Sequence, residues 1–223
     1  MEDLTLKTEV NLYYDLHAPE NIPAPLLVAL HGYAENKRHM MRQAQMMAPE
    51  GFAIAALQAV HQHIIPPKEP TDPLRFGFGW LTNFKPEESI AIHHKFILDV
   101  IEKLTAEGIA DKNKIFLLGF SQTSALNFKF AFTHPDVMRG VFGLCGGIPG
   151  DLETNEIYRE TEADLFYLYG DQDKFYQLEK FQEFAARLPK FAKNFRHKQY
   201  DAKHEITPEM RADVKDRLAE LSV

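Results

Sequence analysis

The sequence contains few of the features that mark secreted, membrane or disulfide-stabilised proteins. Its one cysteine, Cys145, cannot form an internal disulfide, so the fold does not depend on an oxidising compartment. No window approaches the roughly 18 apolar residues of a membrane span, and the N-terminus lacks the basic start and apolar stretch of a secretory signal. These absences predict a cytoplasmic protein with no membrane span, in which Cys145 is a buried structural thiol.

An excess of positive charge is also missing. The chain has 25 Lys and Arg against 32 Asp and Glu, for a formal net charge of −7, and its basic residues are scattered rather than clustered. Because phosphate neutralisation dominates nucleic-acid binding, we expect no nucleic-acid partner. With 223 residues, 45% of them hydrophobic and 26% charged, the composition suits one domain, residues 1–223, around a sizeable core.

Short apolar runs alternate with helical patterns along most of the chain. Runs typical of parallel strands covered on both faces occur in residues 25–32, 52–58, 114–120, 140–146 and 165–170. Helical periodicity or helix-start signals occur in residues 36–48, 86–108, 122–133, 175–188 and 208–221. The N-terminal segment 4–16 alternates, which predicts a long or broken antiparallel edge strand. This order predicts an α/β fold with a mostly parallel central sheet and helices on both faces.

The segment KIFLLGFSQTSAL, residues 114–126, has a serine directly after a buried strand. A serine on a sharp turn between a strand and a helix exposes its hydroxyl above the sheet edge, as a catalytic nucleophile must. The alternative is that Ser121 caps the following helix, a common role for serine, and a bare Gly-x-Ser motif does not decide between them. A nucleophilic serine needs a base and an acid, so the test is whether both follow at later strand ends.

The candidate bases beyond the later strands are two histidines. His197 lies inside a strand segment with charged neighbours and is better explained as an exposed strand residue, whereas His204 lies in the loop before the last helix. The candidate acids are Asp171 and Asp173, which follow a buried strand and which could instead cap the next helix. The chain order Ser, Asp, His is that of α/β-hydrolases, so Ser121 and His204 with one of these aspartates form the predicted catalytic triad.

A tetrahedral intermediate also needs hydrogen-bond donors for its negative oxygen. The backbone N–H of Gln122, directly after the nucleophile, supplies one. The segment LHGYAEN follows an earlier strand with a His-Gly turn, and the N–H of Tyr33 is the best candidate for the other donor. His31 in the same turn is expected to brace the loop.

With these residues in place, the chain resembles the phospholipase/carboxylesterase family of α/β-hydrolases, which includes acyl-protein thioesterases and small bacterial carboxylesterases. LHGYAEN is similar to that family's oxyanion-loop motif, GFSQTSAL to its nucleophile elbow, GDQD to its acid loop and KHEI to its histidine loop. The family's acid is the third residue after the loop glycine, so the resemblance favours Asp173 over Asp171.

Two positions depart from the family pattern. Thr123 replaces the second glycine of the Gly-x-Ser-x-Gly elbow, and Tyr169 stands where histidine is more usual. A β-branched residue at position 123 must fit against the neighbouring strand or push the helix outward. Neither change removes a reacting group.

The leading hypothesis is a serine hydrolase that cleaves carboxylic esters of small or medium acyl chains through an acyl-enzyme on Ser121, with no cofactor and no metal. A thioesterase or a lysophospholipase would use the same triad, and a catalytically inactive binding protein on a hydrolase scaffold is the non-enzyme alternative. Histidines at 61, 63, 93 and 94 lack a further ligand at a recognised zinc spacing, which argues against a metal-dependent hydrolase. The expected partner is a small-molecule ester, and the sequence leaves the oligomeric state open, a homodimer included.

Residues 59–85 contain proline, glycine and aromatic residues without a sustained period. Connections this long are usually disordered or functional, and the aromatic content argues against disorder. The segment follows a strand whose carboxyl end opens on the side where α/β sheets bind ligands. It therefore predicts a wall of the acyl site, with four assigned substrate-binding residues: Ile64, Ile65, Phe78 and Trp80.

Overall fold

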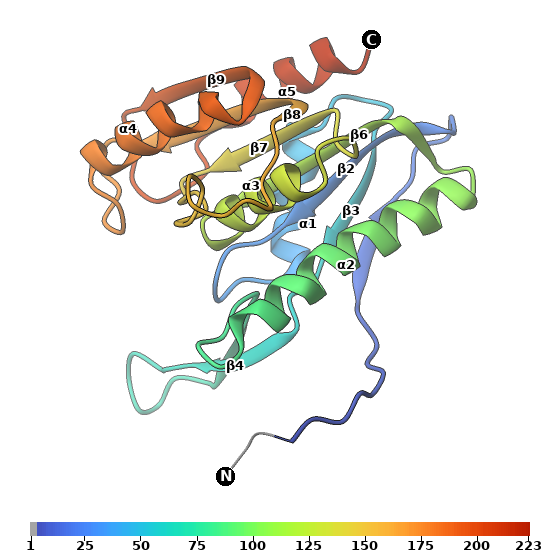
Figure 1. The fold of residues 1–223 in the computed structure, drawn as a ribbon. Coiled ribbons are helices and arrows are strands. Elements are labelled where there is room, and N and C mark those ends of the chain that lie inside the picture. Colours follow the sequence, from blue (N-terminus) through green and yellow to red (C-terminus); the bar gives the residue numbers. More distant parts are fainter. Residues whose placement is uncertain (1–3) are drawn as a thin grey trace.

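The computed structural model describes residues 4–223 and has a mostly parallel sheet at its centre (Figure 1). Within these residues the sheet has seven strands, in the spatial order β1-β3-β2-β6-β7-β8-β9. Neighbouring strands are parallel except β1 and β3, which are antiparallel. The strands are β1 (Tyr14–His17), β2 (Ala24–Leu30), β3 (Ala53–Leu57), β6 (Ala110–Phe120), β7 (Gly140–Leu144), β8 (Thr161–Gly170) and β9 (Ala192–Tyr200). The predicted α/β fold class is confirmed.

Each central strand contributes alternate side chains to two separate hydrophobic cores. In β2, Leu26, Val28 and Leu30 belong to one core, while Leu27 and Ala29 belong to the other. This follows because successive side chains of a strand point to opposite faces of the sheet. Burial on both faces explains why these strands lack polar alternation in the sequence.

Helices cover both faces of the sheet, as predicted. The helices that close the first core are α2 (Pro86–Ala106), α3 (Gln122–Thr133) and α4 (Leu178–Arg187), which lie in front of the sheet in Figure 1. The helices that close the second core are α1 (Lys37–Met47) and α5 (Pro208–Leu221). A short 3-10 helix, Leu188–Lys190, follows α4.

Local capping chemistry defines the helix starts. Asn36 Oδ1 accepts the His39 N–H at 3.0 Å at the start of α1. Thr207 Oγ1 accepts the Met210 N–H at 3.2 Å at the start of α5. Helix α2 instead begins with Pro86, whose missing N–H costs nothing in a first turn.

The structure differs from the sequence predictions in two segments. Of the N-terminal segment 4–16, only β1 is a strand, and residues 4–13 form neither helix nor strand. Residues 59–85 are not a structureless connection, because β4 (His61–Ile65) and β5 (Arg75–Gly79) pair as an antiparallel ribbon, which lies near the first turns of α2 (Figure 1). This ribbon buries few of its residues, so its strands lack the apolar pattern by which the other strands were predicted.

Candidate active site

Ser121 lies on the sharp turn between β6 and α3. Its φ of 56° and ψ of −112° fall outside the conformations that a residue with a side chain usually adopts. The Ser121 N–H donates to the Leu144 carbonyl at 2.8 Å. Glycine is required at position 146, since a Cβ there would lie 2.1 Å from the Ser121 carbonyl oxygen. The Ser121 side chain makes no capping hydrogen bond to α3, so the structure does not support the helix-cap alternative.

The side chains of Ser121, His204 and Asp173 form a continuous hydrogen-bonded chain. His204 Nε2 lies 2.8 Å from Ser121 Oγ, and His204 Nδ1 lies 2.6 Å from Asp173 Oδ2. His204 belongs to the loop between β9 and α5, and Asp173 to the loop after β8. Because an aspartate only accepts hydrogen bonds, Nδ1 carries the imidazole hydrogen and Nε2 accepts from the serine hydroxyl.

The aspartate that contacts His204 is held rigidly by its own loop. The Asp173 side chain has no exposed surface, and its Oδ1 accepts the N–H groups of Phe175 at 2.7 Å and Tyr176 at 3.3 Å. Helix α4 begins at Leu178 rather than at the predicted residue 175. Asp171 is half-buried and accepts instead from a glutamine of β9.

The loop after β2 lies against the nucleophile turn. Gly32 permits this approach, since a Cβ there would lie 2.9 Å from the Phe120 ring and 3.3 Å from Ser121 Cβ. The loop is braced by His31, whose Nδ1 donates to the Gly32 carbonyl at 2.7 Å and whose Nε2 accepts the Ala59 N–H at 3.1 Å. Burial lowers the pKa of His31 to about 4, so this imidazole is neutral at pH 7.

Two backbone N–H groups remain available beside the serine. In the loop after β2, the N–H groups of Gly32 and Ala34 are both bound at 2.9 Å, by the Glu35 carboxylate and by a carbonyl of β5. Within residues 4–223, the N–H groups of Tyr33 and Gln122 have no hydrogen-bond partner. These two are the donors that the sequence predicted for an oxyanion hole.

An open cavity of about 640 Å³ adjoins the Ser121 hydroxyl. The residues that line it are Tyr33, Glu35, Phe120, Ser121, Gln122, Lys174, Phe175, Tyr176 and His204. The Phe175 ring packs edge-on against the His204 imidazole, with 4.6 Å between ring centroids. Lys174, Phe175 and Tyr176 were not predicted from the sequence as site residues, although their place directly after Asp173 was a usable signal.

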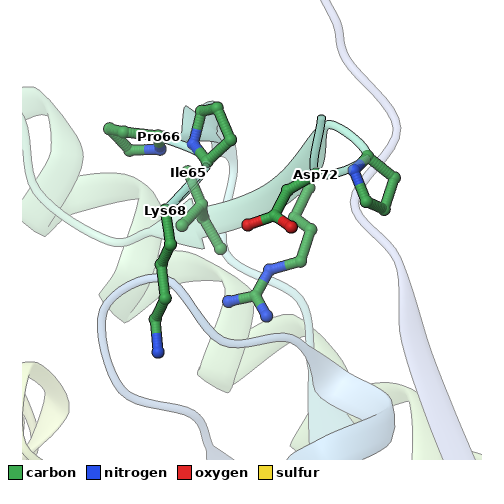
Figure 2. A pocket seen from close by; sticks show the side chains of 7 residues that line it. Ile65, Pro66, Lys68 and Asp72 are labelled. Atoms are coloured by element: carbon green, nitrogen blue, oxygen red, sulfur yellow. The ribbon is translucent and has the colours of Figure 1, made fainter. Parts of the chain in front are cut away.

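None of the four residues assigned to substrate binding lines this cavity. Trp80 is 2% exposed, and its indole N–H donates to the His31 carbonyl at 2.9 Å, so the side chain is internal rather than a pocket wall. Phe78 packs against the first core from β5, and Ile64 is exposed on β4. Ile65 lines a separate cavity of about 340 Å³ at the tip of the ribbon. Figure 2 shows this second cavity, with Ile65, Pro66 and Lys68 on one side and Asp72 opposite.

Both departures from the family pattern are accommodated inside the fold. Thr123 is fully buried, and its Oγ1 lies 3.0 Å from the carbonyl oxygens of Leu30 and Phe120. Of the two predicted outcomes, a fit against the neighbouring strand or an outward shift of the helix, the structure has the first, because Thr123 packs against the end of β2. Tyr169 is buried, and its hydroxyl lies 3.2 Å from His197 Nδ1 on β9. His197, the other candidate base, therefore contacts Tyr169 rather than Ser121.

A family model described as phospholipase/carboxylesterase matches residues 13–222. The chain belongs to this family. Among curated relatives of the chain is the esterase NocK of Nocardia uniformis subsp. tsuyamanensis, which is described as putative and is 27% identical over 168 residues. That alignment covers 72% of this chain and 44% of NocK, so the chain spans less than half the length of this relative.

Solved structures of low sequence identity share the fold across nearly the whole chain. The Bacillus cereus carboxylesterase is 14% identical with a TM-score of 0.73, and 94% of each chain is covered. The Zea mays acyl-protein thioesterase 2 is 16% identical with a TM-score of 0.68, covering 95% of this chain and 99% of the other. These likenesses confirm the predicted α/β-hydrolase fold.

Two kinds of feature are absent from the described residues. No helix within residues 4–223 is long and apolar enough to cross a lipid bilayer. In the same part of the chain, no three His, Cys, Asp or Glu side chains are grouped as metal ligands would be. Of the histidines considered above, His61 Nε2 lies 3.0 Å from Ser89 Oγ, and the His63 ring stacks on Tyr33.

Acidification is expected to destabilise the fold through two buried histidines and one partly buried histidine. Burial lowers the pKa values of His31 and His94 to about 4 and that of His93 well below 6.5. An unfolded chain protonates these imidazoles near pH 6.5, so the folded state loses stability as the pH falls from about 6.5 to about 4. The free energy of unfolding in urea should drop by about 2 kcal/mol or more between about pH 7 and about pH 4.5.

The control for this prediction is His94→Gln, which removes the partly buried imidazole on α2, away from the serine. The loss of stability between the two pH values should be smaller in this variant than in the native protein. Equal losses in both proteins would contradict the assignment of the effect to His94.

Proposed function

We propose that the protein is a serine hydrolase that cleaves carboxylic esters through an acyl-enzyme on Ser121. The observation that carries the proposal is the hydrogen-bonded chain from Asp173 through His204 to Ser121, with separations of 2.6 and 2.8 Å. A serine held at positive φ against a histidine and a buried carboxylate is poorly explained by packing alone. Membership of the phospholipase/carboxylesterase family supports the same chemistry.

The first half-reaction forms the acyl-enzyme. Ser121 Oγ attacks the ester carbonyl carbon while His204 Nε2 takes the hydroxyl proton, and Asp173 stabilises the resulting imidazolium. The carbonyl oxygen becomes negative and accepts hydrogen bonds from the N–H groups of Tyr33 and Gln122. The intermediate then collapses, His204 returns its proton to the leaving oxygen, and the alcohol departs.

The second half-reaction releases the acid. A water molecule loses a proton to His204 and attacks the acyl carbon, and the same two N–H groups stabilise the new oxyanion. Collapse of this intermediate breaks the bond to Ser121 Oγ, which regains a proton from His204. The nucleophile, the base and the oxyanion donors all belong to this chain.

The cavity beside Ser121 supports an ester with a small or medium apolar acyl chain. Four of its nine lining residues are phenylalanine or tyrosine: Tyr33, Phe120, Phe175 and Tyr176. Its volume of about 640 Å³ lies within the range of pockets for small molecules.

We also propose, from composition, that residues 1–223 form one domain and that the protein acts in the cytoplasm.

The proposal is tested by labelling the native protein with a fluorophosphonate and locating the adduct by mass spectrometry. Such reagents react only where a hydroxyl, a base and an oxyanion hole act together, so the adduct is expected on Ser121. An adduct elsewhere, or none on a folded sample, would contradict the proposal.

The substrate class is tested by rates on p-nitrophenyl esters of increasing acyl length, compared with an acyl-CoA and a lysophospholipid. We expect the largest kcat/KM for esters with short or medium acyl chains. A clear preference for the acyl-CoA or the lysophospholipid would instead assign thioesterase or lysophospholipase activity to the same residues.

A further inference from the structure

Trp80 links the two chain segments that carry the candidate oxyanion donors. Its indole N–H donates to the His31 carbonyl at 2.9 Å, two residues before Tyr33. Its backbone N–H donates to Gln122 Oε1 at 2.8 Å. We propose that Trp80 is a positioning residue, which holds the Tyr33 and Gln122 N–H groups at the spacing that stabilises the oxyanion. This inference rests on the proposed serine hydrolase function.

The Trp80 ring is confined to one orientation. It is 2% exposed, tilted against the His31 ring at 5.4 Å and edge-on to the His93 ring at 5.2 Å between centroids. A side chain enclosed in this way cannot turn without breaking the bond to the His31 carbonyl. The loop after β2 is thereby tied to a rigid part of the first core.

The ribbon that precedes Trp80 also contacts the same loop, directly after Tyr33. The Ala34 N–H donates to the Phe78 carbonyl at 2.9 Å, and the Phe78 N–H donates to the Glu35 carbonyl at 3.2 Å, so a single antiparallel bridge at Glu35 joins the loop to β5. Glycine is needed at position 77, since a Cβ there would lie 2.6 Å from Ala34 Cα. The ribbon therefore acts on the site through the loop rather than by lining the cavity.

The Tyr33 side chain also contacts the ribbon, through its ring. The ring stacks on His63 of β4, with 4.5 Å between centroids and 9° between planes. A Cβ at Gly79 would lie 3.2 Å from the same ring, which shows how closely β5 approaches it. The ring contact from β4 and the indole bond from Trp80 restrain the Tyr33 peptide from two directions.

Preorganised donors are effective because they need not move as charge develops on the substrate oxygen. Loss of one such donor costs about 10²- to 10³-fold in kcat, and a displaced donor costs less than an absent one. Trp80→Phe keeps an aromatic ring and removes the indole N–H, so the His31 carbonyl loses its partner. We expect kcat for an ester to fall about tenfold, with KM within about twofold of the native value.

The discriminating measurement is the affinity for an aliphatic trifluoromethyl ketone. Ser121 Oγ adds to the ketone carbon, its proton passes to His204, and the ketone oxygen becomes the oxyanion, with no group leaving. The affinity of each folded site therefore reports on the oxyanion donors. Trp80→Phe should weaken this inhibitor about tenfold, which a loss of fold stability alone would not do.

Phe130→Leu is the matched control, because Phe130 is buried in the same core and contacts His94 and His134 rather than the oxyanion loop. This variant should lose stability while its inhibitor affinity and kcat per folded site stay native. Gln122→Met provides a second test if Trp80→Phe does not fold, since it removes the acceptor of the Trp80 N–H and retains the Gln122 backbone donor. It too should weaken the inhibitor several-fold.

The outcomes separate this inference from the proposed function. If the native protein hydrolyses no ester, or if its activity survives Ser121→Ala, then the proposed function fails. If the native protein is active and both Trp80→Phe and Gln122→Met keep native inhibitor affinity, then Trp80 does not position the oxyanion donors. Equal weakening in Phe130→Leu would likewise overturn the inference, because it would assign the effect to general loosening of the core.

Discussion

Ser121→Ala is expected to lower kcat for ester hydrolysis by about four orders of magnitude or more and to abolish fluorophosphonate labelling. The Ser121 hydroxyl is hydrogen-bonded to His204 Nε2, and no other hydroxyl contacts this imidazole in the described residues. A small residual rate should remain, since the oxyanion donors and the binding cavity are untouched by the substitution. The measurement is steady-state hydrolysis of a p-nitrophenyl ester by purified protein.

The matched control for this prediction is Ser124→Ala. Ser124 is a buried serine in the first turn of α3, and its Oγ donates to the Gly147 carbonyl at 3.2 Å rather than to His204. This variant should keep activity and labelling within a few-fold of native. If Ser121→Ala retains most of the native rate while circular dichroism shows a folded protein, the nucleophile has been assigned wrongly.

Asp173→Asn is expected to lower kcat by about a thousandfold or more. The Asp173 carboxylate accepts from His204 Nδ1, which leaves Nε2 free to take the serine proton. An amide at position 173 can donate to Nδ1, and the imidazole hydrogen then moves to Nε2, where it blocks proton transfer. The hydrogen bonds from the Phe175 and Tyr176 N–H groups can be kept by the amide oxygen, so the loop should stay folded.

Asp171→Asn is the control two residues away. Asp171 accepts a hydrogen bond from Gln199 at 3.2 Å and does not contact His204, so the loss of its charge should change kcat by less than tenfold. The thermal unfolding midpoint of each variant should lie within a few degrees of the native midpoint. A large loss in Asp171→Asn with a small loss in Asp173→Asn would reverse the assignment of the acid.

The elements of the sheet were predictable because their cause is local. Strands buried on both faces are uniformly apolar over five to eight residues, and the helices between them begin at residues that satisfy free N–H groups. The candidate nucleophile and base followed from the same pattern, since loops at the carboxyl ends of parallel strands meet at one edge of a sheet. The structure brings Ser121 and His204 into contact although they are 83 positions apart.

Position in the chain did not show which aspartate is the candidate acid. Asp171 and Asp173 both follow β8, and strand-end placement alone left them equal. The family resemblance favoured Asp173, and the structure supplies the physical difference. Two N–H groups of the following loop turn the Asp173 carboxylate inward, while Asp171 extends toward β9.

The sequence by itself determined the α/β class, the alternation of strands and helices that builds the central sheet, the family and the strand-end residues that are candidates for chemistry. All of these depend on short-range patterns of burial and on motifs. Only the tertiary structure decided how residues 59–85 are arranged and which segments they contact. Trp80 was expected to wall the acyl site, yet its hydrogen bonds join it to residues 49 and 42 positions away, His31 and Gln122. An aromatic residue in an aperiodic segment has the same sequence signature whether it faces a substrate or a backbone carbonyl, and only the packing of distant segments distinguishes the two.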